Sequence, residues 1–210
     1  MDYLLTSMKI LKTPPAPPGR PRAFDMEVAL DSALRVFWEK GYEGASLADL
    51  TAAMGINRPS LYSAFGNKEA LFRKVMDRYA AGPASFFGKA LEAPTARAVA
   101  EQLLRGAVEA QCHTGHPRGC MAVQSALVCG DEALSVRAEL TARRAAAQQA
   151  LRERLERAKA DGDLPRTADP AALAQYLAAV VQGLAVQASS GASRAELAGV
   201  AEMALKAWPK

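Results

Sequence analysis

Apolar residues recur every three to four positions along most of this chain, which is the spacing of one face of an α-helix. Glycine, proline and capping side chains separate the segments that show this spacing. Gly130 and Asp131, for example, are expected to end one helix and cap the next. The predicted helices cover residues 25–40, 46–54, 57–65, 67–81, a short piece near 86–91, 96–111, 121–128, 132–160, 170–188 and 193–208. The pattern predicts an all-α fold.

Two of these helices are short and are separated by one glycine. Ser46 and Asp49 have the spacing of a capping box, and Gly55 suits the left-handed turn that ends a helix. Asn57 can cap the second helix, and Pro59 fits its first turn. The stretch therefore predicts a helix-turn-helix.

The outward side of the second helix is polar, with Arg58, Ser60, Tyr62 and Ser63 outside the apolar stripe. No acidic residue occurs between Asp49 and Glu69, so no carboxylate would repel phosphate there. Such a helix suits a DNA major groove, in which donors meet base edges and hydroxyls meet phosphates. The alternative is an ordinary helical hairpin with a solvated face.

Three sequence runs resemble the N-terminal DNA-binding domain of TetR/AcrR-type transcriptional regulators. The runs are GYEGASLADL (41–50), GINRPSLY (55–62) and FGNKEALF (65–72), and the resemblance spans residues 25 to about 72. One departure is Thr51, where that family usually has alanine. The resemblance implies a three-helix N-terminal helix-turn-helix domain followed by a larger C-terminal helical domain for ligand binding and dimerisation.

The resulting division is a flexible proline-rich basic arm over residues 1–24, a DNA-binding domain over 25–70, and an effector-binding and dimerisation domain over 71–210. Arg58 is assigned to DNA by its position and charge. The resemblance supports Pro59, Ser60, Tyr62 and Lys68 as DNA contacts. The full set expected at DNA is Ser46, Arg58, Pro59, Ser60, Tyr62, Ser63 and Lys68, with Arg20 and Arg22 from the arm.

The arm contains five prolines between residues 14 and 21 and no acidic residue between 9 and 24. Proline keeps such a segment extended, and an extended arm with Arg20 and Arg22 suits minor-groove or phosphate contact. An unstructured leader is the alternative, because Met8 could also initiate translation.

Composition supports a globular helical protein, with 50% hydrophobic and only 6% aromatic residues among 210. The sequence predicts no stretch long and apolar enough to cross a membrane, and the N-terminus is a poor signal peptide. We therefore expect a cytoplasmic protein without a membrane partner. The net charge of +4 is modest, so the placement of the basic residues matters more than their number.

The segment from Cys112 to Cys120 also contains His113 and His116, so metal binding or thiol sensing is chemically possible. The spacing matches no standard zinc pattern, and structural roles for these residues are preferred. A reactive thiol would most plausibly be Cys120, near Arg118. No metal and no cofactor is predicted. No nucleophile elbow, phosphate loop or metalloprotease motif occurs, so an enzyme is disfavoured.

The last two predicted helices are apolar on more than one side. In the family that this sequence resembles, the last two helices of each subunit form a homodimer interface, which implies the same role for them here. The predicted function is a ligand-responsive repressor that binds a pseudo-palindromic operator as a homodimer and is released by a small molecule. An architectural DNA-binding protein would instead lack a cavity. The expected pocket walls are Phe86, Phe87, Leu104, Gln111, Met121, Gln124, Ser125, Tyr176 and Val180.

Overall fold

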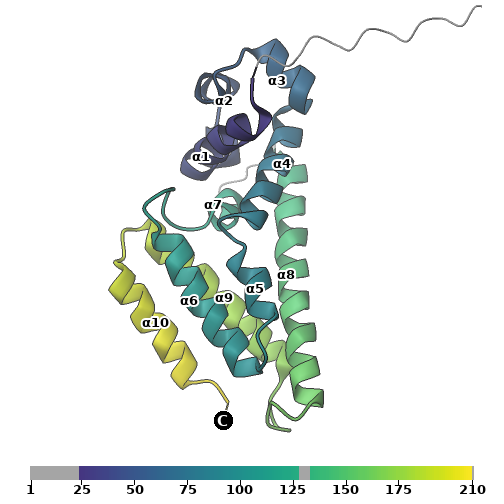
Figure 1. Ribbon diagram of the computed structural model, residues 1–210, viewed down its shortest axis with the longest axis vertical. Helices are drawn as coiled ribbons and strands as arrows, with labels where there is room; N and C mark the ends of the chain where they lie inside the picture. Colours follow the sequence, from purple (N-terminus) through teal and green to yellow (C-terminus); the bar gives the residue numbers. More distant parts are fainter. Residues whose placement is uncertain (1–23, 128–132, 210) are drawn as a thin grey trace, which may run out of the picture.

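The computed structural model describes residues 24–127 and 133–209, and the described chain is helical and contains no strand. The first helices of the chain lie at one end of an elongated molecule, and the later helices form a bundle at the other (Figure 1). The helices are α1 (Met26–Gly44), α2 (Leu47–Met54), α3 (Arg58–Phe65), α4 (Lys68–Ala81), α5 (Phe86–Leu91), α6 (Ala96–Cys112), α7 (Met121–Leu127), α8 (Leu134–Ala160), α9 (Pro170–Ser189) and α10 (Arg194–Lys206). The all-α prediction is confirmed.

Side-chain caps begin most of these helices. Asn67 accepts a hydrogen bond from the Ala70 N–H at the start of α4, and Asp169 caps α9 ahead of Pro170. Ser193 begins α10 with a capping box. These bonds satisfy backbone donors that have no partner inside a helix. The predicted boundary at Gly130 and Asp131 lies outside the described residues.

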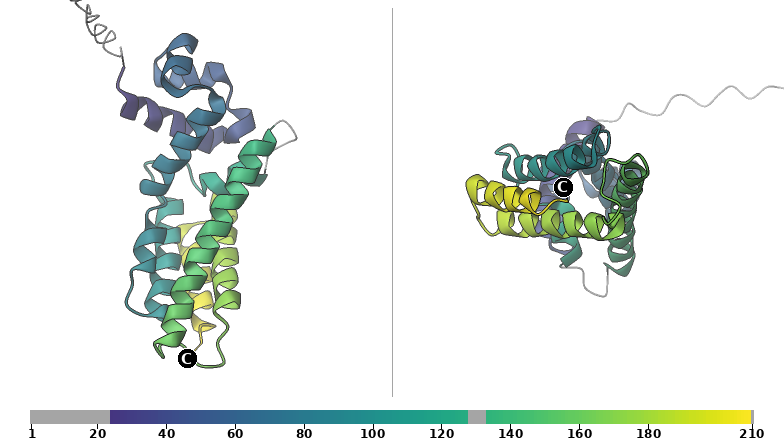
Figure 2. Two further views of the ribbon diagram at one scale, coloured as in Figure 1. Left: turned by 90° about the vertical axis from the view of Figure 1, so that its right-hand side faces the viewer. Right: turned by 90° about the horizontal axis from the view of Figure 1, so that it is seen from below.

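The buried apolar side chains form two clusters. The first, here the N-terminal core, joins α1–α4 to residues of α7 and the beginning of α8, including Met121, Val136 and Leu140. The second, here the bundle core, joins α5, α6, α9 and α10 to the later part of α8, including Leu151 and Leu155. α8 runs along the side of the molecule and contributes to both (Figure 2).

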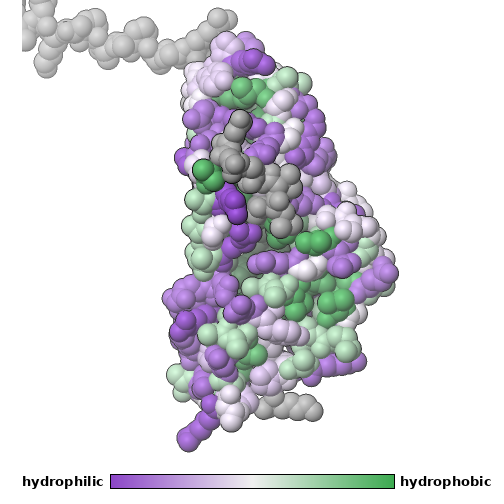
Figure 3. Space-filling view, turned by 180° about the vertical axis from the view of Figure 1, so that it is seen from behind, coloured by the Kyte–Doolittle hydropathy of each residue, from purple (hydrophilic) through white to green (hydrophobic). Residues whose placement is uncertain are grey.

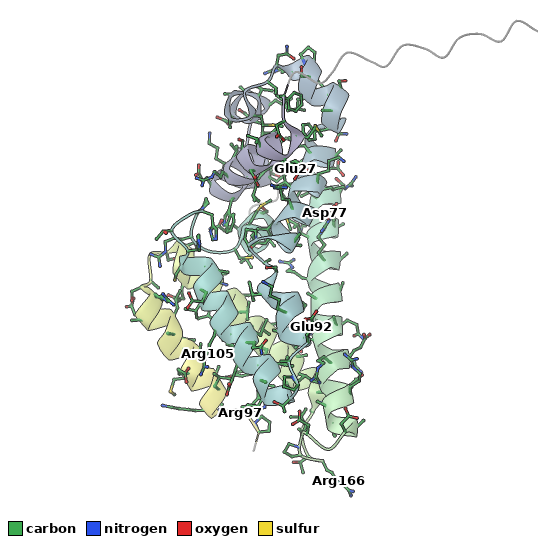
Figure 4. The ribbon with its side chains drawn as sticks, viewed as in Figure 1. Glu27, Asp77, Glu92, Arg97, Arg105 and Arg166 are labelled. Atoms are coloured by element: carbon green, nitrogen blue, oxygen red, sulfur yellow. The ribbon has the colours of Figure 1, made fainter. Side chains whose placement is uncertain are left out.

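Ion pairs attach α4 to its neighbours on two sides. Arg78 pairs with Glu27 and Asp31 of α1, and Arg143 of α8 lies 2.8 Å from Asp77. Glu27 and Asp77 are labelled where α1 and α8 approach α4 (Figure 4). Each of these pairs is partly exposed, so each contributes little stability by itself. Together they define the orientation of α4 between α1 and α8.

The sequence expectation about membrane-spanning length is wrong for α9. Pro170–Ser189 contains no charged residue, and its mean hydropathy of 1.4 makes it long and apolar enough to cross a membrane by length and composition. Only 28% of the 18-residue stretch with this mean hydropathy is buried within one chain. A single helix of this kind is weak evidence for a membrane, because helices of soluble cores and interfaces have the same composition.

Candidate DNA-binding surface and effector cavity

The turn between α2 and α3 is built around Gly55, which has φ 64° and ψ 29° and ends α2 in the left-handed conformation. A side chain is disfavoured at that backbone conformation, so glycine suits the position. Asn57 then accepts a hydrogen bond from the Ser60 N–H at 2.8 Å and begins α3. Leu61 and Phe65 are buried beneath α3, which fixes its outward side.

Arg58, Pro59, Tyr62 and Ser63 are exposed on α3, and Ser60 is half-buried. Tyr62 remains 48% exposed, which is high for a large aromatic residue. α3 lies at the outer end of the molecule (Figure 1). The structure therefore brings the expected α3 contacts together on one accessible surface.

Lys68 is the first residue of α4, and its Nζ lies 4.5 Å from the centre of the Tyr42 ring. The Tyr42 ring is itself packed against Phe37 and Phe72. Burial lowers the pKa of Lys68, and the nearby Glu43 partly opposes that shift. The ammonium group is thus positioned by a cation–π contact beside the end of α3.

The Ser46 hydroxyl is engaged within the protein, because it accepts from the Asp49 N–H and donates to the Asp49 carboxylate. Lys40 also pairs with Asp49 at 2.6 Å. The hydrogen bond from Lys40 and those from Ser46 lower the pKa of Asp49 to about 2. The arm residues Arg20 and Arg22 lie outside the described residues.

A cavity of about 200 Å³ lies between the N-terminal core and the bundle core. Its walls are mainly apolar and come from α1, α4, α5, α6, α7, α8 and α9. Arg144 is the charged side chain in its described lining, and no carboxylate is present there. The composition is that of a small-molecule site, and the volume, below the roughly 300 to 1,000 Å³ usual for drug-sized ligands, suits a smaller molecule.

The expected pocket residues divide into several groups. Phe86, Phe87 and Gln111 line the cavity. Leu104, Met121 and Ser125 are buried in the surrounding packing instead, because their side chains fill the helix contacts behind the walls. Gln124 donates to the Arg118 carbonyl, Tyr176 is exposed, and Val180 lines a separate groove between α9 and α10.

Several wall residues were not expected from the sequence. Trp38 of α1 lines the cavity. Arg144 and Gln148 come from a part of α8 that contributes to neither core, and Tyr79 and Cys120 join them. A polar indole N–H within an apolar stripe is the one sequence signal that could have suggested Trp38.

The segment from Cys112 to Cys120 does not assemble a metal site. Among the described residues no group of three or more histidine, cysteine or acidic side chains is arranged to hold an ion. His113 Nδ1 instead accepts from the Gly115 N–H, and the His116 ring stacks on His113 and on Trp38. The Tyr79 hydroxyl donates to Cys120 Sγ at 3.1 Å, and burial raises the pKa of Tyr79.

The outer surface of α9 and α10 is unusually apolar. Val186, Val200 and Met203 are exposed, Met203 by 63%, and Tyr176 is partly exposed beside them. Figure 3 shows apolar side chains gathered on the side of the molecule where α9 and α10 lie. Arg105 of α6, labelled in Figure 4, forms an exposed ion pair with Glu202 of α10. An exposed patch of this kind marks an interface.

An exposed recognition helix in a helix-turn-helix, joined to a helical bundle with an internal cavity, defines a ligand-responsive DNA-binding regulator. Two family models match the chain, one described as bacterial regulatory proteins, tetR family, over residues 29–75, and one as the tetracyclin repressor-like C-terminal domain over 96–203. The chain belongs to the TetR family of transcriptional regulators. It is not an enzyme.

Relatives and solved structures agree over nearly the whole chain. The transcriptional repressor ComR of Escherichia coli is 36% identical over 199 residues, which are 91% of this chain and 92% of ComR. A cysteine mutant of the TetR-family regulator CifR, solved with a 26-bp double-strand operator, is 46% identical with a TM-score of 0.86. That match covers 90% of this chain and all of the CifR chain. A putative TetR regulator from Rhodococcus is 44% identical with a TM-score of 0.60, and the match covers 88% and 99% of the two chains.

Proposed function

We propose that this protein is a repressor that binds a pseudo-palindromic operator as a homodimer and releases it when a small molecule occupies the cavity. The exposed polar surface of α3 is the observation that supports DNA binding most directly. The operator complex of CifR, 46% identical, supports the same role for this chain. Thiol or metal sensing by the Cys112–Cys120 segment is not favoured.

Arg58 and Lys68 have different expected roles at DNA. Arg58, exposed at the start of α3, contacts base edges, whereas Lys68 contacts backbone phosphate. Arg58→Ala should cost about 1 to 3 kcal/mol of binding and relax sequence preference. Lys68→Ala should weaken all duplexes alike and reduce the slope of log affinity against log salt by about one unit.

The test is fluorescence anisotropy with an operator selected from a random duplex pool, at several salt concentrations. Lys74→Ala, an exposed lysine two turns further along α4, is the matched control and should change neither property. Unchanged operator affinity in both Arg58→Ala and Lys68→Ala would contradict the proposed surface.

The apolar surface of α9 and α10 is the proposed homodimer interface. A groove between these helices is lined by Val180, Gly183 and Val200, among others, and a second copy of the same surface would cover it. This also explains why α9 is largely unburied within one chain. Two recognition helices can then reach half-sites about one turn, roughly 34 Å, apart.

Met203→Asp tests the interface because it places a charge in the exposed apolar surface. We expect a monomer by light scattering and a large loss of operator affinity, since each half-site would be bound independently. Val28→Asp, a similar change at an exposed apolar residue of α1, is the control for oligomeric state and should leave the dimer intact. A dimeric Met203→Asp protein would contradict this assignment.

A further inference from the structure

Two buried polar atoms of cavity-lining residues have no hydrogen-bond partner among the residues that the structure describes. They are the indole Nε1 of Trp38, a donor, and the amide Oε1 of Gln111, an acceptor. Trp38 is only 2% exposed and Gln111 only 3%. An unpartnered buried polar atom is costly, and natural proteins retain few of them. A partner supplied from the cavity would relieve both.

The orientation of the Gln111 amide follows from its one observed bond. Its Nε2 donates to the Val181 carbonyl at 3.3 Å. A flipped amide would place Oε1 against that carbonyl, and two acceptors repel each other. Gln111 therefore presents an acceptor that requires a donor, which a carboxylate ligand cannot provide.

The Trp38 ring is held on two sides. It stacks on His116 at 4.3 Å between ring centres and meets the Tyr79 ring edge-on at 4.9 Å. These contacts fix the direction of its N–H before any ligand binds. Tyr79 and Cys120 are already hydrogen-bonded to each other, so neither needs a ligand.

We infer that the cavity binds a small, neutral, mainly apolar molecule with a hydroxyl group, which accepts from Trp38 Nε1 and donates to Gln111 Oε1. This inference rests on the proposed function and specifies its effector class. The cavity, at about 200 Å³, is somewhat larger than an apolar cavity of about 150 Å³ that holds benzene. A monocyclic alcohol or phenol fits that size.

This mode of binding places the ligand in direct contact with the DNA-binding helices, because Trp38 belongs to α1. α1 packs on α2 and is joined to α4 by the Arg78 ion pairs. A bound hydroxyl therefore acts on the same rigid group of helices that presents α3. A ligand that prefers the non-binding arrangement should lower operator affinity about 5- to 150-fold.

The probes are benzyl alcohol, ethylbenzene of nearly equal size, and benzoate, each titrated by calorimetry into the dimeric full-length protein. The variants are Gln111→Leu, which removes the amide oxygen together with the amide nitrogen that bonds Val181, and Trp38→Phe, which removes the indole N–H and keeps an aromatic ring. Gln102→Leu, the same change at an exposed position of α6 outside the cavity lining, is the matched control. Circular dichroism and light scattering establish that each variant is folded and dimeric.

The ratio of the affinities for the two neutral probes is compared between wild type and each variant. The difference in solvation between the free probes is the same in every protein, so it cancels in this comparison. We expect the affinity for benzyl alcohol, relative to that for ethylbenzene, to fall about five- to tenfold in Gln111→Leu and in Trp38→Phe, and to remain unchanged in Gln102→Leu. With Trp208 replaced by phenylalanine, Trp38 is the one tryptophan left, and its emission should shift with benzyl alcohol.

Equal relative affinities in wild type and both variants would overturn the inference. Tighter binding of benzoate that disappears in Arg144→Met would also overturn it, in favour of an anion site. Binding of none of the three probes to a protein that still binds operator would overturn the effector class alone. Failure of the ligand-free protein to bind any operator would instead refute the proposed function, so the two failures are distinguishable.

Discussion

The contact between α5 and α6 leads to a prediction about a single methyl group. A Cβ added at Gly106 would lie 2.8 Å from Phe86 Cβ and 3.1 Å from two of its ring atoms. Phe86 Cβ is attached directly to the backbone of α5, so a change of rotamer cannot relieve the contact. Gly106→Ala must displace α5, and with it one wall of the cavity.

The magnitude follows from two opposing effects. Replacing glycine by alanine within a helix stabilises by about 0.5 to 1 kcal/mol, whereas overpacking costs about 1 to 3 kcal/mol. Gly88→Ala, within α5, is the matched control because a Cβ there has nothing within 4 Å. The helix effect is similar in both variants, so their difference isolates the close contact.

Differential scanning calorimetry at one protein concentration provides the measurement. For a chain of this size 1 kcal/mol corresponds to about 2 to 4 °C in Tm. Gly106→Ala should therefore melt roughly 2 to 12 °C below Gly88→Ala. Equal Tm values for the two variants would refute the close packing of Gly106 on Phe86.

Three further predictions concern the N-terminal helices. Asn57→Ala and Asn67→Ala should each destabilise by about 1 kcal/mol in denaturant titrations, while Ser85→Ala, at a helix start without a side-chain cap bond, should not. The pKa of Asp49 is about 2, below its usual 3.8, so the stability it contributes is present above about pH 4 and is lost as the pH falls towards 2. Asp49→Asn should remove that part of the acid dependence, measured by Tm between pH 5 and 2. Arg78→Met should lower stability by less than about 1 kcal/mol per ion pair, and high salt should reduce the difference from wild type.

The helix-turn-helix could be predicted from the sequence because its determinants are local. Ser46, Gly55 and Asn57 each fix a helix end through bonds or backbone conformations that involve only nearby residues. A match to a known family then assigns the surrounding helices. Local chemistry of this kind is visible in the order of residues alone.

The cavity could not be predicted in the same detail, because its walls come from seven helices far apart in the sequence. The spacing of apolar residues distinguishes a buried side of a helix from an exposed one, but not a wall from the packing behind it. Leu104 and Phe86 have the same apolar character, yet Leu104 fills the core and Phe86 lines the cavity. Trp38 was missed because the spacing of apolar residues along α1 does not show that this ring reaches the boundary between the two cores.

The position of the cavity follows from the two cores that it separates. Trp38 and Tyr79 belong to the N-terminal core, whereas Leu103 and Leu151 belong to the bundle core, and all four line the cavity. Close-packed interiors resist deformation, so free volume and relative movement are most easily accommodated where two such interiors meet. A molecule bound between the two cores contacts both of them. Any change in the distance between the cores therefore alters the contacts that the bound molecule makes. In the proposed function, the same boundary provides both the effector site and the means by which the effector acts on α3.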